Sequence, residues 1–138
     1  MIEGISHITF IVCDLERTAR FFVDALDARE VYASGEKRFS LSKEKFLLVG
    51  GAWIALMEGD SERESADRRG YGHVAFKVPE ADFDSLVDRI TRWGVDIHAE
   101  RPRIQGEGRS FYFYDFDHHL FELHAGTLEE RLDAYSFS

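Results

Sequence analysis

An internal repeat constrains the fold of this chain more strongly than any other feature of its sequence. Residues 5–12 (ISHITFIV) recur as residues 71–78 (YGHVAFKV), so that His7 aligns with His73 at an offset of 66 residues. Both segments contain β-branched and aromatic residues, which favour strands. The repeat therefore predicts two similar half-domains, each of which begins with a strand that carries a histidine.

A helix is expected after each of these strands. Asp14 can cap a helix whose apolar residues form one stripe, and Pro79 and Asp82 introduce a second such helix, which Gly94 ends. Strand-like segments follow the helices, at residues 39–41, 46–49 and 53–57 in the first half and at 111–114 and 120–124 in the second. The predicted fold class is α+β, with two βαβββ modules.

The two modules are expected to form a single domain. The predicted parts, in chain order, are module one at about 1–59, a linker at about 60–70, module two at about 71–126 and a C-terminal helix at about 127–135. The linker is dense in charged residues, which is typical of a solvated connection. Thr127 and Glu130 match a capping box, which predicts the start of the last helix.

Composition and charge exclude several classes of function. The chain has 138 residues, 44% of them hydrophobic, which is enough for one buried core. No apolar run approaches the roughly 20 residues that span a bilayer, and the N-terminus lacks the pattern of a signal peptide, so a cytoplasmic protein is expected. The net charge of −9 argues against nucleic-acid binding. Cys13 cannot form an internal disulfide, and a lone thiol on an apolar strand usually fills a core.

Three side chains are candidates for a metal site. Side chains alternate between the two faces of a strand, so His7 shares a face with Thr9, and Glu122 shares one with His124. The imidazoles of His7 and His73 and the carboxylate of Glu122 could therefore converge. Imidazole and carboxylate groups are usual ligands of Mn, Fe, Co, Ni or Zn ions, and a set of three leaves coordination positions open for chemistry.

The repeat also shows which residue of the first half corresponds to Glu122. Aligning residues 55–59 with 122–126 places Ala55 opposite Glu122, so the first half lacks a carboxylate there. Other histidines compete as ligands, and they are His118, His119 and His124. The first two of these lie in an expected turn between the last two strands.

Four segments of the chain resemble one known family. They are residues 5–9 (ISHIT), 39–46 (FSLSKEKF), 101–115 (RPRIQGEGRSFYFYD) and 121–132 (FELHAGTLEERL). Together they resemble the fosfomycin-resistance proteins of the vicinal oxygen chelate superfamily, in particular the hydrolase type called FosX. This resemblance runs nearly from end to end. It implies that His7, His73 and Glu122 bind Mn(II), with other divalent metals as alternatives, and that the modules are exchanged in a homodimer, so that His7 meets the other two ligands from the other chain.

The resemblance also implies roles for residues outside the metal site. It makes Glu44 the general base, although residues 43–45 taken alone look like a charged turn between two strands. It implies substrate contacts for Thr9, Tyr112 and Arg131. A phosphonate needs donors, and three arginines lie in a glycine-containing segment, namely Arg101, Arg103 and Arg109. Of these, Arg103 is taken as the candidate for binding substrate.

The function expected from this resemblance is hydrolysis of fosfomycin. Water is a poor nucleophile toward an epoxide, so a base and a cation that stabilises the alkoxide would both lower the barrier. Three alternatives stay open: a thiol transferase acting on fosfomycin, an Fe(II) extradiol-type dioxygenase with the same ligands, and a noncatalytic drug-binding protein. The thiol-transferring relatives carry a potassium-binding serine pattern that residues 106–109 do not reproduce.

Overall fold

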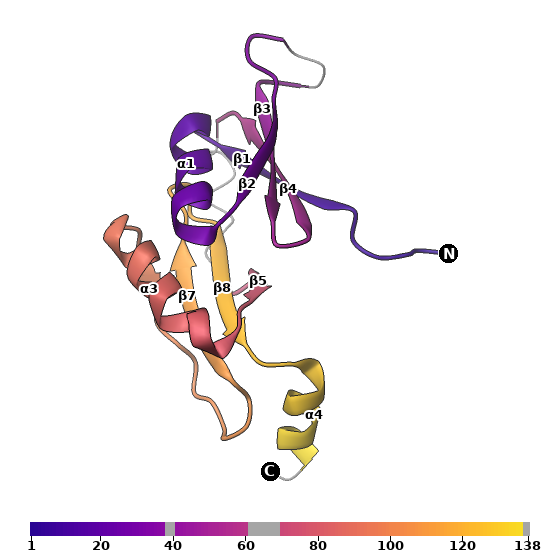
Figure 1. Cartoon of the computed structure of the whole chain (residues 1–138), viewed down its shortest axis with the longest axis vertical. Coiled ribbons are helices and arrows are strands. Elements are labelled where there is room, and N and C mark those ends of the chain that lie inside the picture. The colour runs from indigo at the N-terminus through magenta and orange to yellow at the C-terminus, as the bar shows by residue number, and fades with distance from the viewer. Residues whose placement is uncertain (38–40, 61–69, 137–138) are drawn as a thin grey trace. The chain divides into compact units, whose positions relative to one another are not determined.

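The computed structural model describes residues 1–37, 41–60 and 70–136. The chain folds into two compact units, Met1–Arg69 and Gly70–Ser138. Figure 1 shows the course of the chain, with unit 1 in indigo to magenta and unit 2 in salmon to yellow. The linker predicted at 60–70 lies almost entirely outside the described residues.

Unit 1 is a βαβββ module. Its elements are β1 (His7–Val12), α1 (Leu15–Leu26), β2 (Arg29–Ala33), β3 (Glu44–Val49) and β4 (Ala52–Glu58). The strands form one sheet in the order β1-β4-β3-β2, in which β1 is parallel to β4 and the other pairs are antiparallel. Helix α1 packs on this sheet (Figure 1).

Helix α1 begins and ends where local chemistry requires it. The carboxylate of Asp14 accepts a hydrogen bond from the backbone N–H of Arg17 at 3.0 Å, which confirms the predicted cap. The helix ends at Asp27, whose φ of 55° is left-handed. Phe21 and Phe22 are fully buried, and each such side chain contributes about 1.5–3 kcal/mol through burial.

Unit 2 repeats the module and adds a helix. Its elements are β5 (Val74–Lys77), a 3-10 turn (Glu80–Asp82), α3 (Phe83–Arg92), β6 (Ile97–His98), β7 (Arg109–Tyr114), β8 (Leu120–Ala125) and α4 (Leu128–Ser136). The sheet order is β5-β8-β7-β6, with β5 parallel to β8. The predicted pair of βαβββ modules is therefore confirmed. The Thr127 hydroxyl accepts from the backbone N–H of Glu130 at 3.1 Å, which confirms the predicted cap of α4.

Three expectations about the first half were wrong. The second strand of unit 1 is β2 and not residues 39–41, of which 39 and 40 lie outside the described residues and Leu41 lies outside any strand. Strand β2 lies at the edge of its sheet and is largely exposed, so its sequence shows no apolar alternation. The charged residues 43–45 are not a simple turn, because Glu44 begins β3. Cys13 follows β1 and is exposed, so it does not fill the core.

Unit 2 contains one strand that the sequence did not predict. Strand β6 has two residues, Ile97 and His98, and pairs with β7. A strand of this length is too short for a periodic pattern.

In the described part of the chain no helix is long and apolar enough to cross a membrane. The cytoplasmic location expected from the sequence stays a prediction.

Candidate functional site

Strand pairing arranges equivalent residues in rows across the two sheets. The row in unit 1, from β1 to β2, is Thr9, Ala55, Phe46 and Tyr32. The row in unit 2, from β5 to β6, is Ala75, Glu122, Tyr112 and His98. These registers confirm that Ala55 is the structural equivalent of Glu122, as the repeat in the sequence predicted.

The contact between His73 and Glu122 is the centre of the candidate site. His73 Nε2 lies 2.8 Å from Glu122 Oε1, and Glu122 is 4% exposed. His73 Nδ1 donates to the backbone carbonyl of Tyr71 at 2.6 Å. In a neutral His73 this bond leaves a lone pair on Nε2, which faces a carboxylate oxygen. Two acceptors at this distance repel each other unless a cation, either a proton or a metal ion, lies between them.

The same contact fits two ligands of one metal ion. A carbonyl that holds Nδ1–H and so directs Nε2 toward the metal is a recurrent feature of histidine ligands. Two ligand atoms each about 2.1 Å from one ion, at a right angle, are about 3 Å apart. The observed separation of 2.8 Å between His73 Nε2 and Glu122 Oε1 is close to this value. The pair therefore has the donor types and the spacing that a divalent cation requires.

The third predicted ligand, His7, belongs to unit 1. It is the first residue of β1, is exposed, and its ring lies 4.3 Å from that of Trp53. Its Nδ1 is 3.0 Å from the hydroxyl of Ser6. Among the described residues of either unit, no three histidine, cysteine, aspartate or glutamate side chains gather as a complete set of ligands.

The second oxygen of Glu122 is surrounded by donors. Ser110 Oγ lies 2.5 Å from Oε2, His124 Nδ1 lies at 3.2 Å and Arg103 Nη2 at 3.5 Å. Burial acts to raise the pKa of Glu122, but the hydrogen bonds from Ser110 and Tyr112 and the nearby histidines outweigh it, so this pKa is below its ordinary value. Glu122 is therefore an ionised, buried carboxylate near neutral pH.

Tyr112 and Arg103 form the wall beside this carboxylate. The Tyr112 hydroxyl accepts from Tyr71 at 2.6 Å and from Arg103 Nη2 at 2.8 Å. Burial, the hydrogen bond with Tyr71 and the charge of Glu122 raise the pKa of Tyr112 to about 12, so it stays protonated. Within the described residues, Arg103 Nε and Nη1 are buried and have no hydrogen-bond partner, although Nη1 lies 3.9 Å from Glu107 Oε1 as an ion pair. Guanidinium donors without a hydrogen-bond acceptor favour an anionic ligand.

The loop that carries Arg103 is held by Glu107, which the sequence analysis did not single out. Glu107 is 1% exposed and accepts from Arg101 Nη2 at 2.5 Å, from the Tyr135 hydroxyl at 2.6 Å and from the backbone N–H of Ile104 at 3.0 Å. The hydrogen bonds from Arg101 and Tyr135 hold the pKa of Glu107 far below its ordinary value. No local sequence signal marks this residue, because its partners come from the loop and from α4.

Gly108 follows Glu107 and is required by the backbone. Its φ is +89°, and a Cβ at this position would lie 2.4 Å from the carbonyl oxygen of Ala125. Only glycine fits such a close approach with a left-handed φ. The glycines of the loop thus let it lie against the end of β8, which carries His124.

The other two arginines of this segment do not contact Glu122 in the structure. Arg101 pairs with Glu107, and Arg109 pairs with Glu80 at 3.1 Å and Asp84 at 2.8 Å. The Arg109 guanidinium also lies over the Phe83 ring, 4.2 Å from its centre. These contacts tie β7 to α3. Of the three arginines, Arg103 is the one that reaches Glu122 and Tyr112 in the described part of the chain.

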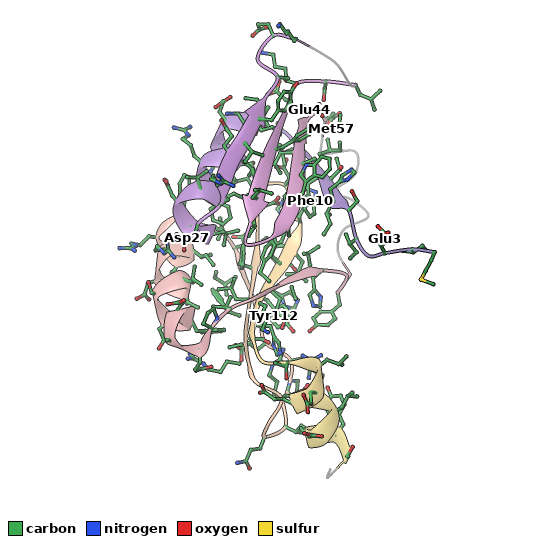
Figure 2. All side chains as sticks on the ribbon, turned by 45° about the vertical axis from the view of Figure 1, so that its right-hand side comes forward. Glu3, Phe10, Asp27, Glu44, Met57 and Tyr112 are labelled. Atoms are coloured by element: carbon green, nitrogen blue, oxygen red, sulfur yellow. The ribbon has the colours of Figure 1, made fainter. Side chains whose placement is uncertain are left out.

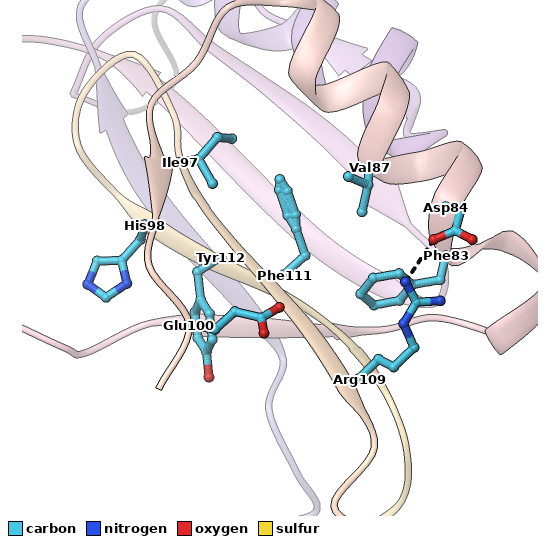
Figure 3. A pocket seen from close by; sticks show the side chains of 9 residues that line it. All are labelled: Phe83, Asp84, Val87, Ile97, His98, Glu100, Arg109, Phe111 and Tyr112. Carbon is cyan, nitrogen blue, oxygen red and sulfur yellow. Dashed lines mark hydrogen bonds and ion pairs between the residues drawn. The ribbon is translucent and has the colours of Figure 1, made fainter. Parts of the chain in front are cut away.

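A pocket of about 300 Å³ lies between α3 and the edge of the sheet in unit 2 (Figure 3). Its lining residues are Phe83, Asp84, Val87, Ile97, His98, Glu100, Arg109, Phe111 and Tyr112. Figure 3 shows Phe111 and Tyr112 pointing in different directions from their strand. Tyr112 lines this pocket and also belongs to the cluster around Glu122, so the pocket adjoins the candidate site.

Glu44 lies in unit 1, at the start of β3. It pairs with Met57 of β4 and is 8% exposed (Figure 2). Its backbone N–H donates to the Ser34 hydroxyl at 2.9 Å, and its carbonyl accepts from the Ser34 N–H at 3.0 Å. By strand register, Glu44 is the equivalent of Ser110 in unit 2. Both contacts hold the backbone of this candidate base.

The remaining predicted residues are placed as follows. Thr9 is exposed on β1 of unit 1. Arg131 is half-buried on α4, and its Nη2 lies 3.4 Å from His124 Nε2. His119 is buried and pairs with Asp115 at 2.6 Å, and His118 has a φ of 64° in the turn. Of the competing histidines, His124 therefore joins the Glu122 cluster, while His119 has a structural partner elsewhere.

The comparisons with known proteins identify the family of this chain. The family model of the glyoxalase/bleomycin resistance protein/dioxygenase superfamily matches residues 4–123. The fosfomycin resistance protein FosX of Listeria monocytogenes is 56% identical over 135 residues, which cover 98% of each chain. The chain belongs to the FosX family within this superfamily. A metallothiol transferase, FosB of Staphylococcus saprophyticus, is 35% identical over 98% of this chain and 85% of its own length.

A solved FosX structure shares the whole fold. It comes from a mutant of the Listeria monocytogenes protein in complex with Mn(II) and 1S,2S-dihydroxypropylphosphonic acid. Its TM-score is 0.85 at 54% identity, and the match covers 98% of this chain and 99% of that one. The resemblance to the FosX type found in the sequence is thus confirmed along nearly the full length of both modules.

Proposed function

We propose that this protein is a Mn(II)-dependent fosfomycin hydrolase, which opens the epoxide with water to a diol and so confers fosfomycin resistance. The contact between His73 and Glu122 carries the proposal, because a neutral His73 whose Nδ1–H is held by Tyr71 places two acceptors 2.8 Å apart, a spacing suited to a shared cation. The relatives support the choice of reaction, since a FosX structure contains Mn(II) together with a dihydroxypropylphosphonic acid, which is a diol. The high identity to FosX favours hydrolysis over thiol transfer.

In this proposal His7, His73 and Glu122 hold the metal ion. The two residues of unit 2 supply one nitrogen and one oxygen, and His7 supplies the second nitrogen. The chemistry that a bound divalent ion supplies is Lewis-acid stabilisation of the negative charge on the epoxide oxygen. Mn(II) is the expected ion, and other divalent metals that accept nitrogen and oxygen ligands are alternatives.

Glu44 acts as the general base. Its carboxylate takes a proton from water as the water oxygen forms a bond to one epoxide carbon. The carbon–oxygen bond of the ring breaks at the same carbon, and the released oxygen takes up a proton to complete the diol. A buried carboxylate on a rigid strand suits this task, since its position is fixed relative to β4.

Substrate recognition is assigned to Arg103, Tyr112, Arg131 and Thr9. Arg103 Nε and Nη1, which have no hydrogen-bond acceptor among the described residues, would donate to phosphonate oxygens, as would Arg131 from α4. The hydroxyl of Tyr112 is held by Tyr71 and Arg103 and offers a fixed polar group beside the reacting centre. Thr9 would contribute a hydroxyl from β1.

We also propose a homodimer with exchanged modules, in which His7 of one chain completes the site of the other. Exposed apolar side chains support a second copy as partner: Ile5 is 82% exposed, Leu128 is 73% exposed and Leu132 is 55% exposed. Mixing His7→Ala and Glu122→Gln chains tests this arrangement. Exchanged modules would leave one intact site in each hybrid dimer and restore activity, whereas sites within single chains would leave the mixture inactive.

The reaction itself is tested with purified, Mn(II)-loaded protein and fosfomycin, with and without glutathione, followed by phosphorus NMR. We expect thiol-independent formation of the diol, which disappears in a Glu44→Gln variant. A thiol adduct as the sole product would make the protein a transferase. Unchanged fosfomycin would show that the substrate is wrong, while retained resistance in cells that carry Glu44→Gln would favour a noncatalytic drug-binding protein.

A further inference from the structure

We propose that Ser110 and His124 are positioning residues, which orient the Glu122 carboxylate so that Oε1 alone is left for the metal. This inference rests on the proposed metal site. It concerns a chain of hydrogen bonds that runs from Arg131 through His124 and Ser110 to Glu122.

The two ends of this chain determine the direction of every hydrogen bond in it. Arg131 has donors only, and an ionised Glu122 has acceptors only. The single proton of the Ser110 hydroxyl therefore points to Glu122 Oε2, 2.5 Å away. Ser110 Oγ must then accept from His124 Nδ1–H, at 2.8 Å. This leaves His124 Nε2 as the acceptor that faces Arg131 Nη2, at 3.4 Å.

The consequence is a difference between the two oxygens of Glu122. Oε2 accepts from Ser110 and lies 3.5 Å from Arg103 Nη2, so its lone pairs face donors within the protein. Oε1 faces His73 Nε2 at 2.8 Å. The carboxylate cannot rotate without breaking its bond to Ser110. The chain therefore selects which oxygen is free, and it links that choice to Arg131, a proposed phosphonate contact.

The absence of a side chain at Gly126 leaves space for the His124 ring. A Cβ on Gly126 would lie 2.8 Å from His124 Nε2, closer than such contacts occur. Any larger residue at position 126 would therefore push the ring away from Ser110 or from Arg131. In unit 1 the equivalent positions of Ser110 and His124 hold Glu44 and Met57, which cannot form such a chain.

The tautomer of His124 is the first measurement, and it needs no metal. Nitrogen-15 NMR of the metal-free protein distinguishes a protonated Nδ1 from a protonated Nε2. We expect Nδ1–H with an unprotonated Nε2. A neutral ring protonated on Nε2 would overturn the proposed order of hydrogen bonds.

The second measurement is the affinity for Mn(II), read from the loss of the free-ion signal in electron paramagnetic resonance. Ser110→Ala should weaken binding by about 10- to 100-fold, which is the usual effect of losing a partner behind a ligand. The matched pair His124→Asn and His124→Gln tests whether the position of the side-chain donor matters, since both variants carry the same amide group. An asparagine amide can replace the Nδ1 donor, so His124→Asn should bind Mn(II) within a few-fold of the unaltered protein, whereas His124→Gln should resemble Ser110→Ala.

Gly126→Ala gives an independent variant that removes no polar group, and it should weaken Mn(II) binding in the same direction. Circular dichroism of each variant checks that it is folded. Equal Mn(II) affinity of Ser110→Ala and the unaltered protein would overturn the inference. A different outcome is the expected tautomer in an unaltered protein that binds no Mn(II). The proposed metal site would then fail, and the positioning role toward it would fail as well. The order of hydrogen bonds would stand.

Discussion

The two units share one backbone plan, yet equivalent rows of their sheets have different chemistry. In unit 1 the row is mainly apolar, and its two rings, Tyr32 and Phe46, lie 4.8 Å apart. Phe46 also lies 5.2 Å from Trp53 of the neighbouring strand. In unit 2 the equivalents of Ala55 and Phe46 are Glu122 and Tyr112, which belong to a hydrogen-bonded network. The difference teaches that a few side chains, and not the fold, decide which module carries the carboxylate.

The loops before β3 and β7 also differ, in how deeply their carboxylates are buried and how many donors they bind. In unit 2 the loop is anchored by Glu107, a buried carboxylate with donors from Arg101 and Tyr135. In unit 1 the corresponding loop has an ion pair between Lys43 and Glu36 at 3.1 Å, in which the Glu36 side chain is 91% exposed. A buried, multiply bonded carboxylate holds a loop in one conformation, whereas an exposed pair contributes little.

The largest expected effect comes from Glu44, the acidic side chain that unit 1 places where unit 2 has Ser110. Changing Glu44→Gln removes the proposed base but keeps the size of the side chain. Turnover should fall by about 10²- to 10⁴-fold, the range for loss of general base catalysis, with Mn(II) affinity unchanged. Steady-state kinetics and Mn(II) titration measure the two effects. Glu58→Gln, at the exposed end of β4, is the matched control, and equal turnover of both variants would remove Glu44 from the mechanism.

The next effect comes from giving unit 1 the carboxylate of unit 2. Ala55 is 4% exposed and pairs with Phe46, so Ala55→Glu would bury a carboxylate beside an aromatic ring. Burial that shifts a carboxyl pKa by about three units costs about 4 kcal/mol of unfolding free energy at neutral pH. Urea unfolding measures this loss. Ala52→Glu, at the exposed start of the same strand, should change stability by less than about 0.5 kcal/mol, and equal effects of the two would contradict the comparison.

A further effect depends on pH. Because the folded pKa of Glu107 is lowered from its ordinary 4.5, its carboxylate stabilises the fold above about pH 4.5 and loses this contribution as the pH falls through the lowered value. Glu107→Gln should therefore be less stable than the unaltered protein at pH 7, and the difference should shrink in acid below pH 4.5. Denaturant unfolding across this range measures it. Glu36→Gln should show no such dependence, and a parallel curve for both variants would refute the assignment.

The smallest effect compares the starts of the two module helices. Asp14 caps α1 through the N–H of Arg17, whereas Asp82 precedes α3 without a side-chain cap bond. Asp14→Ala should cost about 1 kcal/mol of unfolding free energy, and Asp82→Ala close to none. Thermal or urea unfolding distinguishes the two. A larger loss for Asp82→Ala would show that the carboxylates have other roles in the folded units.

Much of the fold could be predicted from patterns that act over short distances. The caps at Asp14 and Thr127, and the alternation that placed Glu122 and His124 on one face, depend on neighbours within a few residues. Strands β2 and β6 were missed because one is exposed at an edge and the other has two residues. Their pairing depends on β3 and β7, which lie elsewhere in the sequence.

The sequence by itself determined the two-module plan, because a repeated pattern of strand, helix and histidine needs only local periodicity to be recognised. Its resemblance to the FosX type also named the proposed ligands and Glu44 as the proposed base. Only the tertiary structure decided that Glu44 is buried on a strand, that Glu107 anchors the loop of Arg103, and that Ser110 connects Glu122 to His124. Burial and hydrogen-bond partners arise from segments far apart along the chain, so their energies cannot be read from any single stretch of residues.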